Sequence, residues 1–175
     1  MDWAEIYTGI PNVTDVMGNE TNLDGVTFID GDRAGNQAIV DTAMAQLGNV
    51  GGAPYWSWYG FNDRVEWCAT FVSWCANQNG VLGSSVPKFA SCRYEGVPWF
   101  QSHNQWASGN DIVPVAGDII FFDWEGDGVP NHVGIVIGTD GSKVYTIEGN
   151  SGDAVRTKSY DLNSKLIFGY GLPNY

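Results

Sequence analysis

One segment of the chain, residues 62–80 (NDRVEWCATFVSWCANQNG), constrains the fold more than any other. At helical spacing its apolar side chains cover most of the surface, and Thr70, Ser73 and Asn77 leave only a thin polar stripe. A helix that is apolar nearly all round has to be buried on several sides. Gly80 is a typical residue to end such a helix. The sequence therefore predicts a central helix around which the rest of the fold packs.

Helical patterns lie on both sides of this segment in the first half of the chain. Residues 32–48 predict a helix with its N-cap at Asp32, and the glycine- and aromatic-rich residues 48–63 predict a loop. Residues 87–106 predict one or two short helices that are broken before Pro98.

The second half of the chain changes to short β-branched or aromatic runs separated by turns. The turn GTDGS joins the second and third runs as a hairpin. Helices followed by antiparallel strands are typical of the α+β class, here with a cysteine-bearing helix packed on a C-terminal antiparallel sheet. The four predicted strands lie within residues 118–124, 132–138, 143–150 and 165–171.

The remaining N-terminal residues, 1–31, have weak periodicity and predict an extension with one short strand at Val26–Ile29. Residues 32–175 then form a single domain, as a chain of 175 residues suggests. The first residues lack the charged-then-apolar pattern of a signal peptide, and no apolar run reaches the roughly 20 residues of a membrane span.

The charge balance excludes some partners. The chain has 8 basic and 20 acidic residues, a net charge of −12. Nucleic acid and anionic membrane surfaces would repel such a chain. Three cysteines cannot all pair with one another, and their spacing lacks the Cys-x-x-Cys of a zinc site. At least one thiol is therefore expected to be free.

Cys68 is the cysteine whose position suggests chemistry. The polar residues Asn62, Asp63 and Glu66 before it suit the start of a helix, which places Cys68 in the first turn. Backbone N–H groups and the helix dipole stabilise an anion there. The alternative is a small buried core residue like Cys75. A nearby histidine would favour a nucleophile.

Of the two histidines, His132 has the more suggestive setting, because it opens a predicted strand and is followed by the small Gly134 on the same face. His103 is interpreted as a surface or capping residue. On the next strand Glu148 and Asn150 lie two residues apart, so both are expected to point the same way toward the imidazole. A cysteine nucleophile needs a base and a group that orients the base.

Four motifs in this order, EWCATFVSWCANQNG, AGDIIFFDW, NHVGIVIG and YTIEGNSG, resemble the CHAP domain family of cysteine- and histidine-dependent amidohydrolases and peptidases. The resemblance covers residues 36–171. It implies a papain-like fold and hydrolysis of an amide bond in peptidoglycan, by an amidase or an endopeptidase, without a cofactor. It also implies the catalytic residues: Cys68 as nucleophile, His132 as base, and Glu148 with Asn150 as orienting groups.

Other features add expectations. The backbone N–H of Cys68 is the expected oxyanion donor, with Asn62 as candidate second donor. Asp123, Glu125 and Asp127 are spaced like half a calcium loop, but a charged turn is favoured because the closing glutamate is missing. Some relatives bind calcium through aspartates before the cysteine helix, and here only Asp63 remains. Several loop aromatics could line a groove, although no binding residue is assigned among Trp56, Trp58, Tyr59, Trp99, Trp106 and Trp124.

Two rival functions use the same fold: a non-catalytic module that binds cell walls, and a papain-like transferase or deamidase. The complete cysteine, histidine and glutamate–asparagine set argues against the binding module. The resemblance implies an extracellular or cell-wall location of bacterial or phage origin. Because anionic walls would not attract a chain of charge −12, a separate wall-targeting region is expected in the full-length protein.

Overall fold

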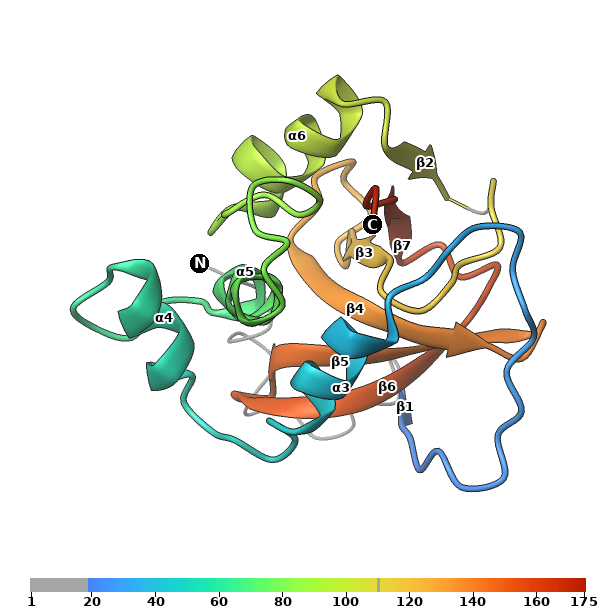
Figure 1. Cartoon of the computed structure of the whole chain (residues 1–175), viewed down its shortest axis with the longest axis horizontal. Helices are drawn as coiled ribbons and strands as arrows, with labels where there is room; N and C mark the ends of the chain where they lie inside the picture. Colours follow the sequence, from blue (N-terminus) through green and yellow to red (C-terminus); the bar gives the residue numbers. More distant parts are fainter. Residues whose placement is uncertain (1–18, 110) are drawn as a thin grey trace.

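The computed structural model describes residues 19–109 and 111–175. Its helices lie along one side of a twisted antiparallel sheet, with α5 between α4 and strand β4 (Figure 1). The described sheet has the strand order β1-β6-β5-β4-β3-β7-β2. The helices are α3 Gln37–Met44, α4 Ala53–Tyr59, α5 Cys68–Gln78, the π-helix η1 Cys92–Gly96 and α6 Val97–Ser102. The strands are β1 Asn19–Glu20, β2 Trp106–Ser108, β3 Ile119–Phe122, β4 His132–Thr139, β5 Lys143–Ser151, β6 Ala154–Asp161 and β7 Ile167–Gly171.

The predicted central helix is confirmed. Helix α5 spans Cys68–Gln78 and the chain turns away through Gly80, whose φ of 68° is the left-handed conformation that glycine adopts readily. Eight side chains of α5 are buried, including the polar Thr70 and Ser73. The Ser73 hydroxyl satisfies the backbone of Phe89, donating to its carbonyl and accepting from its N–H. The helix is therefore enclosed at Thr70 and Ser73 of its polar stripe, whereas Asn77 near its end is exposed.

The sheet separates two apolar clusters. The first cluster lies between the sheet and the helices, and it contains Cys68 and Phe71 of α5 with Ile135 of β4. The second cluster lies on the other face of the sheet and includes Phe122 and Trp124. This two-layer arrangement with a cysteine helix on the sheet is the α+β, papain-like architecture that the sequence predicts.

Two predictions for the first half are wrong. The N-cap of α3 is Asn36, whose side chain accepts a hydrogen bond from Ile39 N, and not Asp32. The preceding residues run against the loop before β3, because Asn36 N donates to Ala116 O and a Cβ at Gly35 would lie only 2.7 Å from that oxygen. The predicted loop 48–63 contains helix α4, which has a proline in its first turn.

The predicted short helices and strands are largely confirmed. The boundary between η1 and α6 precedes Pro98, and the four predicted strands correspond to β3, β4, β5 and β7. The turn GTDGS joins β4 and β5, which pair antiparallel. Strand β6 was not predicted, because Ala154–Asp161 lacks an apolar alternation.

The described part of the N-terminal extension lies on the sheet. Val26–Ile29 is not a strand; instead Phe28 packs edge-on against Tyr145, and β1 pairs with β6. Residues 1–18 of the predicted extension lie outside the described residues, and the domain boundary at residue 31 stays a prediction. Among residues 19–109 and 111–175, each helix is too short or too polar to cross a membrane.

Candidate active site

Cys68 is the first residue of α5 and follows the N-cap Trp67, as the sequence predicts. The thiol side chain is nearly buried, with 5% of the residue exposed. The first backbone N–H groups of a helix have no intrahelical acceptor, so those around Cys68 are available to an anion. Trp67 is fully buried and stacks on Tyr55 of α4, which fixes the start of the helix.

His132 and Glu148 form a buried pair on adjacent strands. His132 Nε2 lies 2.8 Å from Glu148 Oε1, and the two residues are 2% and 1% exposed. The imidazole also has ring contacts with Phe122 and Trp124, whose centroids lie 5.8 and 5.5 Å away. Because Glu148 accepts the proton of Nε2, the other ring nitrogen, Nδ1, is the one left to face a nucleophile.

Gly134 makes room for this pair. Ile135 of β4 pairs with Ile147 of β5, so the next residues along these antiparallel strands, Gly134 and Glu148, also lie opposite each other. A Cβ at Gly134 would lie 2.6 Å from Cγ of Glu148. The glutamate side chain therefore crosses the space above this glycine to reach His132, which confirms the expectation that a small residue here admits a neighbour.

The second oxygen of Glu148 is held by two hydroxyl groups. Thr146 Oγ1 donates to Oε2 at 2.6 Å, and Tyr160 Oη donates to the same atom at 2.7 Å. Neither residue was identified from the sequence. Thr146 lies on the same face of β5 as Glu148, two residues before it, whereas Tyr160 belongs to the unpredicted strand β6. The carboxylate is thus bonded at both oxygens.

The charges of the site reinforce one another. Burial opposes the charged form of His132, but hydrogen bonds to Cys68 and Glu148 and their negative charges outweigh it, so the pKa of His132 lies well above its ordinary value. For Glu148 burial favours the neutral acid, yet the bond to His132 and the charges of His132 and Lys158 lower its pKa. Both groups are therefore charged near neutral pH.

The interaction between Cys68 of α5 and His132 of β4 joins the helix layer to the sheet. Cys68 belongs to the cluster on the helix side, whereas His132 contacts aromatic residues of the cluster on the other face. His132 Nε2 is occupied by Glu148. Nδ1 is buried and makes no other hydrogen bond of regular geometry among the described residues, so it is the ring nitrogen that can interact with the thiol of Cys68. The side chain of Cys68 interacts with His132, the first residue of β4, so the two groups can exchange a proton there.

Asn150 does not lie as the sequence predicts. The register of β5 and β6 shifts between Glu148 and Ser151, and Asn150 has a φ of 57°. The alternation of side chains is interrupted at such a bulge, so Asn150 and Glu148 need not point the same way. The side chain of Asn150 accepts a hydrogen bond from Arg64 Nη2 at 3.1 Å and donates to Glu66 Oε2 at 2.8 Å.

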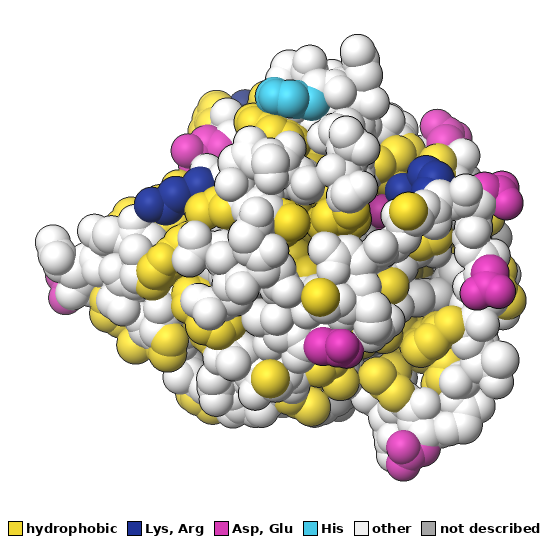
Figure 2. All heavy atoms as spheres, in the orientation of Figure 1, with side chains coloured by type: hydrophobic (Ala, Val, Ile, Leu, Met, Phe, Trp, Pro, Cys, Tyr) yellow, Lys and Arg dark blue, Asp and Glu magenta, His cyan; other side chains and the backbone are white. Residues whose placement is uncertain are grey.

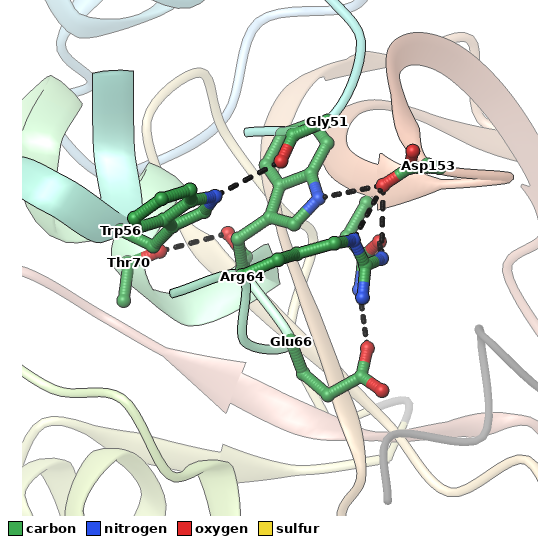
Figure 3. A network of polar contacts seen from close by, with 8 residues as sticks. Gly51, Trp56, Arg64, Glu66, Thr70 and Asp153 are labelled. Carbon is green, nitrogen blue, oxygen red and sulfur yellow. Dashed lines mark hydrogen bonds and ion pairs between the residues drawn. The ribbon is translucent and has the colours of Figure 1, made fainter. Parts of the chain in front are cut away.

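Asn150 is part of a polar network between the segment before Cys68 and the β5–β6 turn. Arg64 donates from Nε and Nη2 to Asp153 Oδ1 at 3.1 and 2.8 Å, and Trp67 Nε1 donates to the same oxygen at 3.1 Å. Figure 3 shows the guanidinium of Arg64 directed at the carboxylate of Asp153. The members of this network, called the entry network below, are Arg64, Glu66, Trp67, Asn150 and Asp153. The network ties the residues next to the thiol to the strand that carries Glu148.

The remaining cysteines and His103 lack this setting. Cys68, Cys75 and Cys92 are all free thiols, and burial raises the pKa of Cys75. His103 is exposed, stacks on Trp99 with a centroid distance of 3.8 Å, and places Nδ1 2.7 Å from Trp99 O. It is a surface residue at the end of α6, as the sequence suggests.

The acidic loop after β3 is a turn held by Asp123. Its carboxylate accepts hydrogen bonds from the backbone of Gly126, Asp127 and Gly128. These bonds explain the Asp-rich spacing as turn chemistry. Among the described residues, no group of three or more histidine, cysteine or acidic side chains is arranged to hold a metal ion.

The loop aromatics pack among themselves in several places. Trp124 stacks on Phe122 beside His132, whereas Trp58 and Tyr59 of α4 face the ammonium of Lys88, which lies 5.3 and 4.7 Å from their centroids.

Asn62, the candidate second oxyanion donor, is exposed at the bend before α5, and its role stays a prediction. On the face drawn in Figure 2, acidic side chains are scattered and the basic ones lie apart from one another.

The fold is papain-like, and its central helix begins with Cys68 beside the bonded pair of His132 and Glu148. The CHAP domain model matches residues 58–150, more than half of the chain. The chain therefore belongs to the CHAP domain family. No functionally curated protein matches it.

The structures of Ly7917 share the fold. Ly7917 has a TM-score of 0.51 at 19% identity, covering 78% of this chain and 62% of Ly7917. A structure of Ly7917 "with the hydrolyzing product of MDP" has the same values. An NLP/P60 family protein described as similar to lipoprotein, from Staphylococcus aureus subsp. aureus Mu50, has a TM-score of 0.42 at 21% identity, covering 87% of this chain and 44% of that one. The chain thus spans about 62% of the length of Ly7917.

Proposed function

We propose that this chain hydrolyses an amide bond of bacterial peptidoglycan by cysteine nucleophilic catalysis. The observation that carries the proposal is the buried pair of His132 and Glu148 beside the thiol at the first residue of α5. Membership of the CHAP family supports peptidoglycan as substrate, as does the hydrolysis product bound to Ly7917. The bond is either the N-acetylmuramoyl-L-alanine amide or a peptide bond of the stem or cross-link.

In the proposed reaction His132 already holds the proton of Cys68 in the resting site, and the thiolate attacks the carbonyl carbon of the amide. The backbone N–H of Cys68, at the helix N-terminus, stabilises the oxyanion that forms. The imidazolium gives its proton to the leaving nitrogen, and the C–N bond breaks to leave a thioester. His132 then takes a proton from water, whose oxygen attacks the thioester, and the C–S bond breaks to restore the thiolate.

Glu148 stabilises the charged histidine throughout these steps. Its carboxylate accepts the Nε2 proton at 2.8 Å, which keeps Nδ1 directed at the sulfur. Asn150 is proposed to act on the other partner, because its bonds to Arg64 and Glu66 hold the segment that precedes Cys68. The proposal assigns Cys68, His132 and Glu148 to the chemistry and Asn150 to positioning.

The test is mass spectrometry of fragments released from purified peptidoglycan by the wild-type chain and by Cys68→Ala. The wild type is expected to release fragments whose masses identify the bond cut, and Cys68→Ala is expected to lose activity by about 10³-fold or more while keeping its fold. A Cys68→Ala protein that cuts walls at the wild-type rate would refute the proposal. Binding to walls with no release by either protein would favour a wall-binding module.

The proposed place of action is the cell wall. A domain of net charge −12 is not steered electrostatically to an anionic wall, so a separate wall-targeting region is proposed to bring it there. Weak binding of this chain alone to purified walls, rising when salt screens the repulsion, would support this arrangement.

A further inference from the structure

The carboxylate of Glu148 has an asymmetric set of partners. Oε1 faces His132 Nε2, whereas Oε2 accepts from both Thr146 Oγ1 at 2.6 Å and Tyr160 Oη at 2.7 Å. The donors come from two adjacent strands, β5 and β6, and Thr146, Glu148 and Tyr160 are each buried. The pair of donors therefore lies on the side of the carboxylate away from the imidazole.

Two donors on one oxygen restrict the rotation of a carboxylate. A carboxylate with one partner can turn about its terminal bond and exchange its oxygens. With Oε2 held by two fixed hydroxyl groups, Oε1 is left directed at His132. Tyr160 can serve only as donor in this bond, because burial and the nearby charge of Glu148 raise the pKa of Tyr160 well above its ordinary value, so that the phenol keeps its proton.

We propose that Thr146 and Tyr160 are positioning residues that hold Glu148 in the orientation in which it bonds His132. The proposal rests on the proposed hydrolase function. It extends the catalytic set across the sheet, from Cys68 on α5 through β4 and β5 to Tyr160 on β6. The two hydroxyl groups touch neither substrate nor thiol, and they act through the carboxylate.

The chain supplies a matched control for removing the Tyr160 hydroxyl. Tyr170 is also buried and belongs to the same apolar cluster, but its hydroxyl has no hydrogen-bond partner among the described residues. Tyr160→Phe and Tyr170→Phe are therefore the same chemical change at two buried sites, of which only one touches Glu148. Thr146→Val removes the second hydroxyl with little change of shape.

The first readout is catalysis on purified peptidoglycan. Tyr160→Phe and Thr146→Val are each expected to lower kcat about tenfold with KM nearly unchanged, and to move the alkaline limb of the pH profile to lower pH. The limb moves because a carboxylate that rotates away stabilises the imidazolium less. Tyr170→Phe is expected to keep the wild-type values. Unchanged kcat and an unmoved limb in both site variants, or an equal loss in Tyr170→Phe, would overturn the proposal.

The second readout needs no substrate, so it separates this proposal from the proposed function. The rate at which iodoacetamide alkylates Cys68 near pH 7, followed by mass spectrometry of the labelled peptide, reports the state of the Cys68–His132 pair. Tyr160→Phe and Thr146→Val are expected to change this rate severalfold relative to the wild type and Tyr170→Phe. If walls are not cut but this difference holds, the function fails and the positioning role stands; identical rates in all four proteins would refute that role.

Discussion

Glu148 and Asn150 lie two residues apart on one strand, yet they belong to different environments. Glu148 is enclosed by the sheet and bonded to His132, Thr146 and Tyr160. Asn150 lies beyond a break in the β5–β6 register and bonds to Arg64 and Glu66, in the segment before the cysteine helix. One short stretch of β5 therefore connects to both halves of the proposed catalytic pair.

The two regions also differ in how far their side chains are exposed to solvent. The His132–Glu148 pair is almost completely buried, whereas the side chains of the Arg64–Asp153 ion pair are 32% and 35% exposed. A buried, hydrogen-bonded charge pair is strongly coupled to its surroundings, whereas an exposed ion pair is weakened by water and salt. We therefore expect changes at Glu148 to affect chemistry most, and changes in the entry network to affect stability and alignment.

The largest effect is expected from Glu148→Gln. Loss of the carboxylate is expected to lower kcat by roughly 100-fold or more, because the imidazolium loses its stabilising partner. Since the charge of Glu148 raises the pKa of His132, its removal lowers that pKa, and the alkaline limb of the pH profile moves to lower pH. Measurement of kcat/KM against pH checks both effects. A limb that stays in place would show that Glu148 does not govern His132.

Gly134→Ala is expected to have the next largest effect. The new Cβ would lie 2.6 Å from Cγ of Glu148, so the glutamate has to shift from His132, and kcat should fall by roughly tenfold or more. Gly138→Ala is the control, because a Cβ there crowds Phe28 at 2.8 Å, at the other end of β4. Wall-cutting assays should separate the two. Equal activities in these variants would contradict the position given to Glu148.

Two substitutions of Asn150 distinguish the effect of its backbone conformation from the effect of its side-chain hydrogen bonds. Asn150→Ala loses the bonds to Arg64 and Glu66 and also keeps a Cβ at a φ of 57°, which alanine tolerates poorly. Asn150→Gly loses the same bonds without that strain. Unfolding in urea should therefore show Asn150→Ala about 1 kcal/mol less stable than Asn150→Gly. Both should have reduced kcat, and wild-type kcat in both would remove Asn150 from the positioning of Cys68.

The smallest effect is expected at Arg64. Arg64→Ala should cost less than about 1 kcal/mol of folding stability, because its ion pair with Asp153 is partly exposed and screened. Arg64→Lys keeps the charge but cannot bond both Asp153 and Asn150 with a planar fork. If the fork matters for alignment, both variants lower kcat to a similar degree, by a fewfold. Full activity of Arg64→Lys would assign the effect to charge alone.

The sequence predicts the chemical core of the site because each feature there is local. Charged residues followed by an apolar run place Cys68 at a helix start, and a strand that opens with His132 is joined to the strand of Glu148 by the short turn GTDGS. The short turn makes β4 and β5 neighbours, but a register shift between Val136 and Gly138 sets which residues face each other near the site. Beyond that shift Gly134 leaves the space that Glu148 crosses to reach His132.

The parts that were missed depend on interruptions of regular structure or on distant contacts. The side-chain alternation that placed Asn150 beside His132 fails at the β5–β6 bulge, which no residue pattern announces. Tyr160 comes from β6, whose residues Ala154–Asp161 are too polar to be recognised as a buried strand. The N-cap of α3 moved from Asp32 to Asn36 because a tertiary contact with Ala116 holds the chain before the helix.

The central claim is that His132, held by Glu148, activates the thiol of Cys68. The most direct test is the pH dependence of Cys68 alkylation by iodoacetamide in the wild type and in His132→Ala, with the modified cysteine identified by mass spectrometry. Wild-type Cys68 is expected to react well below pH 8.5, the ordinary range of a thiol, and His132→Ala is expected to need a higher pH. The same pH dependence in both proteins would show that His132 does not activate Cys68.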